Sequence, residues 1–229
     1  YFNLPKLIKY LLDNTEKISF RLSSLYPQSI TDEFCQVINN NRVQSHFHLS
    51  VQSGSDKILQ IMARPYKAND VKNAVEKLRA IKPNAFIACD IIAGFAGEME
   101  DDFKATVDLC KKCNFTWIHA FPFSPRPGTP GFYMTPKIPQ YIAGNRVKEL
   151  TDLALKNKNN FVNNLVGQSF FAIVENRKSS VIRAVTENFL HVQVIFAQDM
   201  PIKELTGRIL VKIIGQSKIK GCDALAQLI

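Results

Sequence analysis

Three apolar segments of this chain end in the same way, and this shared ending constrains the fold most. The segments His48–Asp56 (HLSVQSGSD), Asp90–Glu98 (DIIAGFAGE) and Trp117–Thr129 (WIHAFPFSPRPGT) each run from apolar or β-branched residues into small polar residues, glycine or proline. Such a break is typical of the carboxyl end of a parallel strand that opens into a ligand site. The three endings therefore predict one site at the top of an α/β barrel.

Strand and helix patterns alternate over the first 134 residues. Apolar runs predict strands at 18–23, 46–51, 85–93 and 116–121. The helical period predicts helices at 3–13, 31–38, 55–62, 69–81 and 100–112, with Thr31 and Asn69 as capping residues. Strands about 30 residues apart with helices between them indicate right-handed βαβ units, and hence a parallel sheet or barrel.

The pattern changes after residue 167. The proline-rich segment 122–139 predicts a long ordered loop, and a helix is expected from Tyr141 to about Val166. Beyond Gly167 the period of two predicts strands at 170–175, 180–186, 190–196 and 208–214. Four or five such strands make a small antiparallel barrel, a fold that often binds oligonucleotides. We therefore divide the chain into the later part of an α/β barrel (1–134), a loop and connecting helix (135–166) and a small β-barrel (167–229).

Composition narrows the class of protein. The formal net charge of +9 favours an anionic partner, most often nucleic acid, although solubility alone is an alternative. No apolar run approaches the roughly 18–20 residues that span a bilayer, and the five cysteines form no regular framework, so we expect a cytoplasmic protein with reduced thiols. Because the chain starts at Tyr1 with a helix already under way, we expect a fragment of a longer protein.

Two cysteines and two histidines have spacings that ligands also use. Cys110 and Cys113 have CxxC spacing, but they end a predicted helix and no second pair follows. His46 and His48 share one face of a predicted strand, but no third ligand follows at a suitable spacing. A zinc site needs four ligands, so we expect structural roles for all four residues and no metal site.

The strand ends themselves suggest a cofactor. The Gln52 amide and the Ser53 hydroxyl can hydrogen-bond to ribose or to amino-acid groups, although a Ser55 helix cap beside a glycine turn would need neither. Gly94 and Gly97 are too few for a dinucleotide fingerprint. The acids that follow, Glu98, Glu100, Asp101 and Asp102, would repel a phosphate at that helix start. A neutral or zwitterionic cofactor fits better, such as an adenosyl group held against the glycine backbone.

Five motifs in this order resemble those of the radical SAM methylthiotransferases: Arg21–Pro27 (RLSSLYP), His48–Ser55, Met62–Tyr66 (MARPY), Asp90–Glu98 and Phe121–Thr129 (FPFSPRPGT). The tail, with 174–175 and 187–192, resembles the TRAM domain of those enzymes. The resemblance implies a partial, open TIM-like radical SAM barrel followed by a small OB-like antiparallel β-barrel. It also implies insertion of a methylated sulfur at C2 of a tRNA adenosine next to the anticodon, with S-adenosylmethionine and 4Fe–4S clusters as cofactors.

The resemblance also indicates where ligands bind. The family's CxxxCxxC loop is not in this sequence, so we expect the cluster ligands upstream, no catalytic residue in the fragment and no activity of the fragment alone. We expect the cofactor site at Ser23, Gln52, Ser53, Asp90, Gly94, Gly97 and Phe121. We expect tRNA contacts, through the anticodon stem-loop of a monomeric enzyme, at Arg126, Arg177, Lys178, Arg183, Lys203 and Lys212.

Motif variants favour one branch of the family. The forms of Ser23–Pro27 and His119–Ser124 resemble the branch that acts on threonylcarbamoyladenosine, and Arg126 between two prolines is placed to bind its carboxylate. The isopentenyladenosine branch and the branch that modifies an aspartate of a ribosomal protein are alternatives within the family. A radical SAM enzyme of another chemistry and a non-catalytic RNA-binding module are alternatives outside it.

Overall fold

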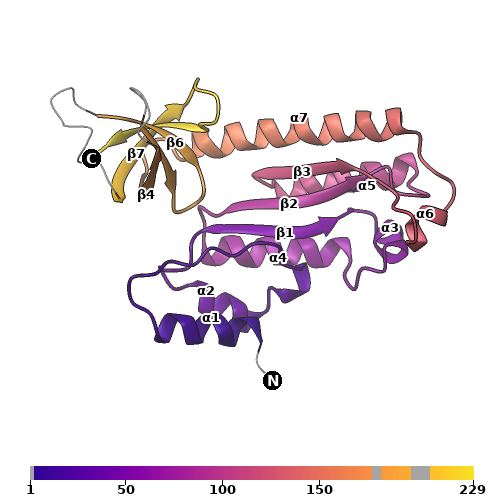
Figure 1. Ribbon diagram of the computed structural model, residues 1–229, viewed down its shortest axis with the longest axis horizontal. Helices are drawn as coiled ribbons and strands as arrows, with labels where there is room; N and C mark the ends of the chain where they lie inside the picture. The colour runs from indigo at the N-terminus through magenta and orange to yellow at the C-terminus, as the bar shows by residue number, and fades with distance from the viewer. Residues whose placement is uncertain (1–2, 177–181, 197–206) are drawn as a thin grey trace.

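The computed structural model describes residues 3–176, 182–196 and 207–229. Strands β1 (His46–Gln52), β2 (Phe86–Ala93) and β3 (Trp117–Pro122) form a parallel sheet in that order (Figure 1). The register pairs Ser50 with Asp90 and Asp90 with His119, so the carboxyl ends of the strands meet at one edge. The α/β pattern with a shared strand end, predicted from the sequence, is confirmed.

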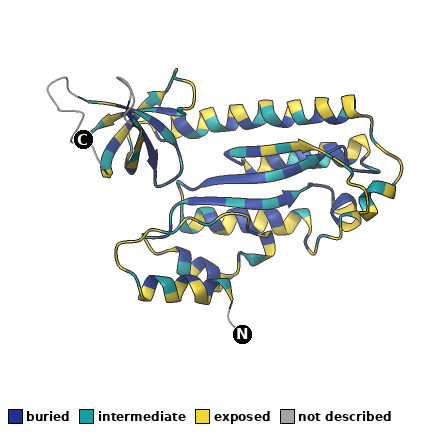
Figure 2. Cartoon of the chain, viewed as in Figure 1, coloured by how far each residue is buried: buried dark blue, intermediate teal, exposed yellow. Residues whose placement is uncertain are grey.

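Helices cover one face of this sheet. The chain forms α1 (Leu4–Asp13), the short 3₁₀ turn η1 (Pro27–Ser29), α2 (Asp32–Ile38), α3 (Asp56–Ile61), α4 (Ala68–Ile81), α5 (Glu100–Cys113), α6 (Pro130–Tyr133) and α7 (Gln140–Asn164). Phe47, Leu49 and Ile91 point from the strands into a core that α4 completes with Val71 and Leu78, and all five side chains are fully buried. Figure 2 shows this buried layer between strands and helices.

The opposite face of the sheet is covered only in part. It carries His48, Ser50, Asp90, Ile92, His119 and Phe121, which we call the open face; these residues range from half-buried to exposed. Side chains alternate between the two faces of a strand, so the apolar residues between them fill the helix-side core. The sheet therefore presents one polar and aromatic surface that the described helices leave accessible.

One predicted strand, two predicted helix caps and one predicted loop can be compared with the structure. The strand expected at 18–23 is reduced to isolated bridges, from Phe20 to Val43 and from Leu25 to Leu49. Thr31 caps α2 as predicted, accepting a hydrogen bond from the Phe34 amide at 3.2 Å. The predicted Asn69 cap is wrong, because α4 begins one residue earlier and the Asp70 carboxylate accepts the Lys67 amide at 2.8 Å. The 122–139 segment is not all loop, since Pro at the first helical position allows the single turn α6.

The remaining strands close into a barrel. β4 (Ser169–Asn176), β5 (Ile182–Thr186), β6 (His191–Ile195), β7 (Arg208–Gln216) and β8 (Ala224–Leu228) follow the order β4-β5-β6-β8-β7. The barrel expected from the sequence is confirmed, but it is mixed rather than antiparallel, because β8 pairs parallel with β6. It lies beyond the amino ends of the sheet strands (Figure 1), where the Phe189 ring lies 4.3 Å from the His46 ring.

Helix α7 connects the two parts. Its residues Leu150 and Ala154 are buried in the core of the sheet, and Val162 belongs to the core of the barrel. Midway, the Asn157 amide donates to the Phe115 carbonyl at 2.9 Å. One continuous helix therefore fixes the barrel relative to the sheet. In the part of the chain that the structure describes, no helix has both the length and the apolar character needed to cross a membrane.

Candidate functional site

A line of polar and aromatic side chains crosses the middle of the open face. His48 Nε2 lies 2.9 Å from Asp90 Oδ1, and the His48 ring stacks on His119 with 5.0 Å between centroids. His119 in turn lies parallel to Phe121 at 6.5 Å. Burial, with His48 nearby, lowers the pKa of His119, so this imidazole is neutral near pH 7. Two of the predicted cofactor residues, Asp90 and Phe121, are thus brought onto one surface.

The two histidines of β1 differ although they share a strand face. His48 hydrogen-bonds Asp90, as the structural interpretation predicted. His46 is buried against Phe189 and Phe86, and among the described residues its Nδ1 has no hydrogen-bond partner. Burial lowers the pKa of His46 to about 4. His46 therefore packs as a neutral ring beneath the barrel.

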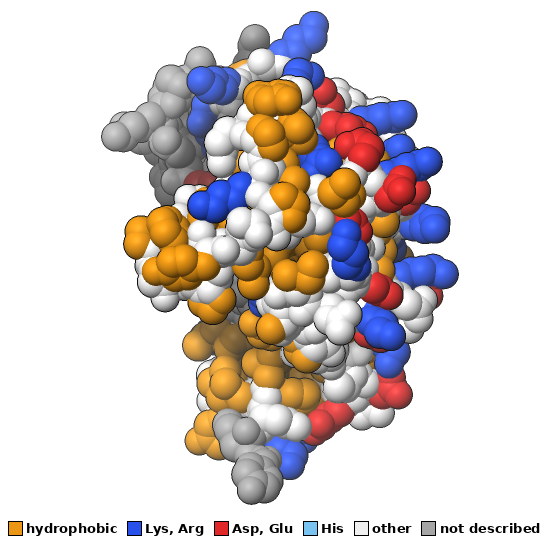
Figure 3. Space-filling model, turned by 90° about the vertical axis from the view of Figure 1, so that its right-hand side faces the viewer, with side chains coloured by type: hydrophobic (Ala, Val, Ile, Leu, Met, Phe, Trp, Pro, Cys, Tyr) orange, Lys and Arg blue, Asp and Glu red, His pale blue; other side chains and the backbone are white. Residues whose placement is uncertain are grey.

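A cavity of about 400 Å³ lies at the carboxyl ends of the strands. The end of α3, the tip of β2 and the proline-rich segment line it, and they contribute Met62, Arg64, Phe95, Phe123 and Arg126. Figure 3 looks onto this end of the molecule, where hydrophobic side chains gather with Lys and Arg between them and most acidic side chains lie along one side. The cavity thus combines apolar walls with two guanidinium groups, a lining suited to an anion on a flat apolar body.

Arg64 is the lining residue to which sequence reasoning gave no role. It lies in the motif Met62–Tyr66, and its Nε atom is buried without a hydrogen-bond partner among the described residues. The motif is fixed against β1 because the Tyr66 hydroxyl donates to the Ser50 carbonyl at 2.6 Å. An arginine two residues before such an anchored tyrosine was the available signal, but only the fold shows which cavity it lines.

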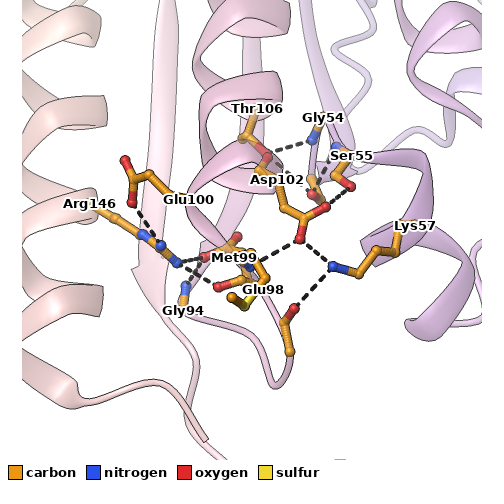
Figure 4. Close-up of polar contacts among 12 residues, drawn as sticks. Gly54, Ser55, Lys57, Gly94, Glu98, Met99, Glu100, Asp102, Thr106 and Arg146 are labelled. Atoms are coloured by element: carbon orange, nitrogen blue, oxygen red, sulfur yellow. Dashed lines mark hydrogen bonds and ion pairs between the residues drawn. The ribbon is translucent and has the colours of Figure 1, made fainter. Parts of the chain in front are cut away.

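The loop after β2 is held by a buried ion pair (Figure 4). Glu98, 1% exposed, accepts hydrogen bonds at 2.6 Å from both the Gly94 amide and Arg146 Nη1 of α7. Burial raises the pKa of Glu98, and Gly94 and Arg146 oppose this rise. Gly94 has φ +76°, and a Cβ there would lie 2.5 Å from that of Ala143. Gly94 therefore permits the close approach of α7.

Ser53 lies in the turn between β1 and α3. Its side chain is fully buried, with Oγ 3.2 Å from Thr106 Oγ1 of α5. Ser55 caps α3 through the Ile58 amide and donates to Asp102 Oδ1 at 2.7 Å, while Lys57 Nζ reaches Asp102 Oδ2 at 2.5 Å (Figure 4). Ser55 thus caps α3 beside a glycine turn, and Ser53 anchors that turn to α5.

The other predicted residues lie apart from one another. Gln52 is half-buried at φ +68° just after a bulge in β1, and Ser23 is exposed beside that strand. Gly97 has φ +78° with open space around its Cα. On the barrel, Arg183 donates to the Lys220 carbonyl at 3.2 Å and Lys212 is exposed. Arg177, Lys178 and Lys203 lie outside the described residues.

The four buried cysteines do not suit an iron–sulfur cluster. Cys35, Cys89, Cys110 and Cys113 are buried in the sheet core, and burial raises the pKa of Cys113 to about 12. Cluster ligands are thiolates, and a thiol held protonated in an apolar core is a poor ligand. In the described ranges, no cluster of three or more His, Cys, Asp or Glu side chains is arranged to hold a metal ion. The structural role expected for Cys110 and Cys113 agrees with their burial in α5.

Comparison with known proteins finds similarity to radical SAM proteins and to tRNA methylthiotransferases. The family model described as the radical SAM superfamily matches residues 1–110. The chain is 46% identical over 189 residues to "Threonylcarbamoyladenosine tRNA methylthiotransferase MtaB" of Treponema pallidum, which covers 82% of this chain and 39% of that protein. It is 32% identical over 220 residues to "tRNA-2-methylthio-N(6)-dimethylallyladenosine synthase" of Rickettsia akari, which covers 93% of this chain and 48% of that protein. The chain thus spans about half or less of the length of these relatives.

One solved structure shares part of the arrangement. Coproporphyrinogen III oxidase (HemN) of Escherichia coli, a radical SAM enzyme, matches 69% of this chain and 36% of its own with 14% identity and a TM-score of 0.45. A score at this level carries no functional comparison.

Proposed function

We propose that the complete protein adds a methylthio group to C2 of a modified adenosine next to the anticodon of tRNA, because the chain is similar to radical SAM proteins and to tRNA methylthiotransferases. The observation that carries this proposal to the chain's own residues is the strand-end cavity with its apolar walls and two arginines. S-adenosylmethionine is the cofactor of this family. When bound, it supplies the radical that removes a hydrogen atom from the substrate carbon.

The residues present fit S-adenosylmethionine. A cavity of about 400 Å³ is within the range of small-molecule sites, roughly 300–1,000 Å³. The buried, unpartnered Nε of Arg64 needs an acceptor, and a carboxylate such as that of a methionyl group supplies one. Phe95 and Phe123 offer apolar surface for an adenine. The proposed cofactor contacts remain Ser23, Gln52, Ser53, Asp90, Gly94, Gly97 and Phe121. The iron–sulfur clusters need thiolates that the buried cysteines of this chain do not provide, so we propose that their ligands lie upstream.

Arg126 is proposed as the contact to the substrate. It is exposed on a segment stiffened by Pro125 and Pro127, and it lines the cavity mouth. A threonylcarbamoyl group carries a carboxylate, which a guanidinium binds through two parallel hydrogen bonds. A dimethylallyl group carries none, so Arg126 favours the threonylcarbamoyl nucleoside as substrate. This agrees with the name of the Treponema pallidum relative.

The barrel is proposed to hold the rest of the tRNA. Arg183 and Lys212 lie on it, and Arg177, Lys178 and Lys203 fall in its undescribed segments. Contacts of this kind bind phosphates, so affinity should fall steeply with salt. Deleting residues 167–229 from the complete protein tests this role: tRNA affinity, measured by filter binding, should fall at least tenfold, and an unchanged affinity would remove the barrel from the interface.

The decisive experiment replaces Arg126 by Lys in the complete protein. Turnover on tRNA with threonylcarbamoyladenosine should fall more than tenfold, because lysine keeps the charge but loses the two-pronged contact. Cleavage of S-adenosylmethionine without tRNA should stay within twofold. Equal loss of both activities would mean that Arg126 holds the cofactor or the fold.

The dimethylallyladenosine substrate is the second candidate, because a relative with that name is similar over 93% of the chain. Mass spectrometry of tRNA nucleosides separates the two: a strain without the gene loses the methylthio form of one nucleoside, and the complete gene restores it. Loss of the dimethylallyl form would reassign the substrate. No loss of either would favour the ribosomal-protein substrate or a non-catalytic RNA-binding module.

A further inference from the structure

A second cavity, of about 320 Å³, lies between the sheet part and the barrel. We call it the junction cleft and define it by Arg21 and Gln44 on the side of the sheet and Phe171, Glu175, Glu187 and Arg208 on the side of the barrel. A backbone hydrogen bond joins its two sides, from the Ser45 amide to the Glu187 carbonyl at 3.1 Å, and a second holds the barrel side together, from the Glu187 amide to the Phe171 carbonyl at 3.0 Å. The cleft is therefore a fixed feature of the junction.

Both arginines of the cleft lie over aromatic rings. Arg208 Cζ is 3.9 Å from the centroid of Phe171, and Arg21 Cζ is 4.3 Å from that of Phe189. In the part of the chain that the structure describes, neither guanidinium makes a hydrogen bond or a short ion pair. A stacked guanidinium keeps its N–H groups free in its own plane. The cleft thus offers two planar sets of donors in prepared orientations.

Carboxylates lie beside these donors. Glu187 is half-buried, and burial raises its pKa while Arg208 opposes the rise. Burial likewise lowers the pKa of Arg21, and Glu175 opposes that shift. Burial thus acts on one charge from each side of the cleft, Arg21 and Glu187, while Glu175 and Arg208 are exposed. Partial burial strengthens the hydrogen bonds that a ligand makes with Arg21 and Glu187.

This lining matches one ligand chemistry. The two carboxylates of the cleft would repel a bare phosphate, and the four charged groups would not favour the apolar chains of a lipid. A nucleobase has a flat apolar face, which the Arg208–Phe171 stack and Ile173 (57% exposed) can cover, and an edge with both donors and acceptors. Arginine donates to base acceptors, glutamate accepts from exocyclic amines, and the Gln44 amide can do either.

We infer that the junction cleft binds an unpaired nucleotide of the RNA substrate, away from the nucleoside that is modified. This inference rests on the proposed function. The cleft lies at the amino ends of the strands and the Arg126 cavity at their carboxyl ends, so the two are separated by about the length of β1, roughly 20 Å. One small molecule cannot fill both, whereas one folded RNA can. The chain's +9 charge favours that partner.

The test uses the complete protein with Arg208→Gln and Arg21→Gln, and with Lys104→Gln as the charge-matched control on the exposed face of α5. Two RNAs are compared. One is the anticodon stem-loop, and the other is a hairpin of equal length in which the nucleotides of that loop are base-paired. Each arginine variant should bind the stem-loop at least fivefold more weakly than Lys104→Gln does, and the paired hairpin within twofold of it. Arg208→Lys should recover less than half of the lost affinity, because an ammonium lacks the stacked plane.

Each outcome decides one point. If the wild-type protein binds neither RNA, the proposed function fails. If it binds the stem-loop and the arginine variants match Lys104→Gln, the cleft is not a nucleotide site. Full rescue by Arg208→Lys would leave only a phosphate contact and overturn base binding. Because Arg21 also bridges to the barrel through Phe189, its variant is checked by thermal unfolding, and Arg208→Gln alone carries the test if that variant is unstable. Crosslinking of a 4-thiouridine in the loop to the 169–176 peptide is expected in the wild-type protein.

Discussion

Replacing Arg146 by Met tests whether the loop after β2 depends on its ion pair with α7. The Arg146 side chain is 8% exposed, and it donates to Glu98 Oε2 at 2.6 Å, to the Glu98 carbonyl at 3.2 Å and to Glu100 Oε2 at 3.1 Å. Methionine has a similar length but no donor, so the buried Glu98 carboxylate keeps only the Gly94 amide. Removing one partner of a buried pair costs about 3–5 kcal/mol. We expect a loss of unfolding free energy in that range at pH 7.5.

The loss should depend on pH. Burial already raises the pKa of Glu98 above its ordinary value, and without Arg146 it rises further. A carboxyl group with a raised folded pKa does not destabilise the fold below its unfolded pKa. Its destabilising effect grows as pH increases from the unfolded pKa to the folded pKa and is complete above the folded pKa. The variant should therefore lose less stability at pH 5 than at pH 7.5, relative to the wild-type chain at each pH.

Urea unfolding of the chain at both pH values measures this effect. The double variant Glu98→Gln, Arg146→Met carries no buried charge at the site and should be at least 1 kcal/mol more stable at pH 7.5 than Arg146→Met alone. Lys148→Met, on the exposed side of the same helix, is the control and should change stability by less than about 0.5 kcal/mol. A loss below about 1 kcal/mol for Arg146→Met, with no dependence on pH, would refute the argument.

Three further predictions concern single residues. Burial lowers the pKa of His46 from 6.5 to about 4, so between these pH values the imidazole is protonated in the unfolded chain but not in the folded one. The free energy of unfolding should therefore fall by about 2 kcal/mol more between pH 7 and pH 5 in the wild-type chain than in His46→Gln, as measured by urea unfolding. Gln52→Ala in the complete protein should weaken S-adenosylmethionine binding without changing the unfolding temperature, and unchanged affinity by titration calorimetry would remove Gln52 from the site. Gly54→Ala should cost about 1–3 kcal/mol, because its Cβ would lie 2.5 Å from Thr106 Cα, whereas Gly144→Ala, with open space in α7, should be neutral or stabilising by about 0.5–1 kcal/mol; equal thermal shifts would contradict this.

Local periodicity predicted most of the elements. The apolar positions of β1, β2 and α4 are set by burial of one face, and Thr31 and Ser55 cap their helices through atoms three residues away in the chain. Such signals lie within a few residues, so the sequence contains them. Asn69 failed as a cap because Asp70 beside it captures the amide one turn earlier. The order of the barrel strands required a tertiary contact, the parallel pairing of β8 with β6.

The candidate site was only partly predictable for the same reason. Gly94 and Ser53 are small residues of the kind expected at a ligand site. In the structure Gly94 packs against Ala143 and Ser53 contacts Thr106, each about 50 residues further along the chain. A small residue in the sequence indicates that another segment packs closely there, but it does not identify that segment. For Arg64 the motif was visible in the sequence, but the cavity that this side chain lines became visible only in the structure.

The number of residues in helix α7 sets both the separation and the rotational orientation of the barrel relative to the sheet. Arg146 holds it beside the loop after β2, and Lys158 holds it beside the barrel through Asp223 at 2.7 Å. An α-helix rises about 1.5 Å and turns about 100° per residue, so these anchors are roughly 18 Å apart and about a third of a turn from alignment. Inserting one residue between them would move the barrel little along the axis but would swing it to another side of the sheet. Natural length variation in this helix is therefore expected in steps of about seven or eleven residues, which restore the phase.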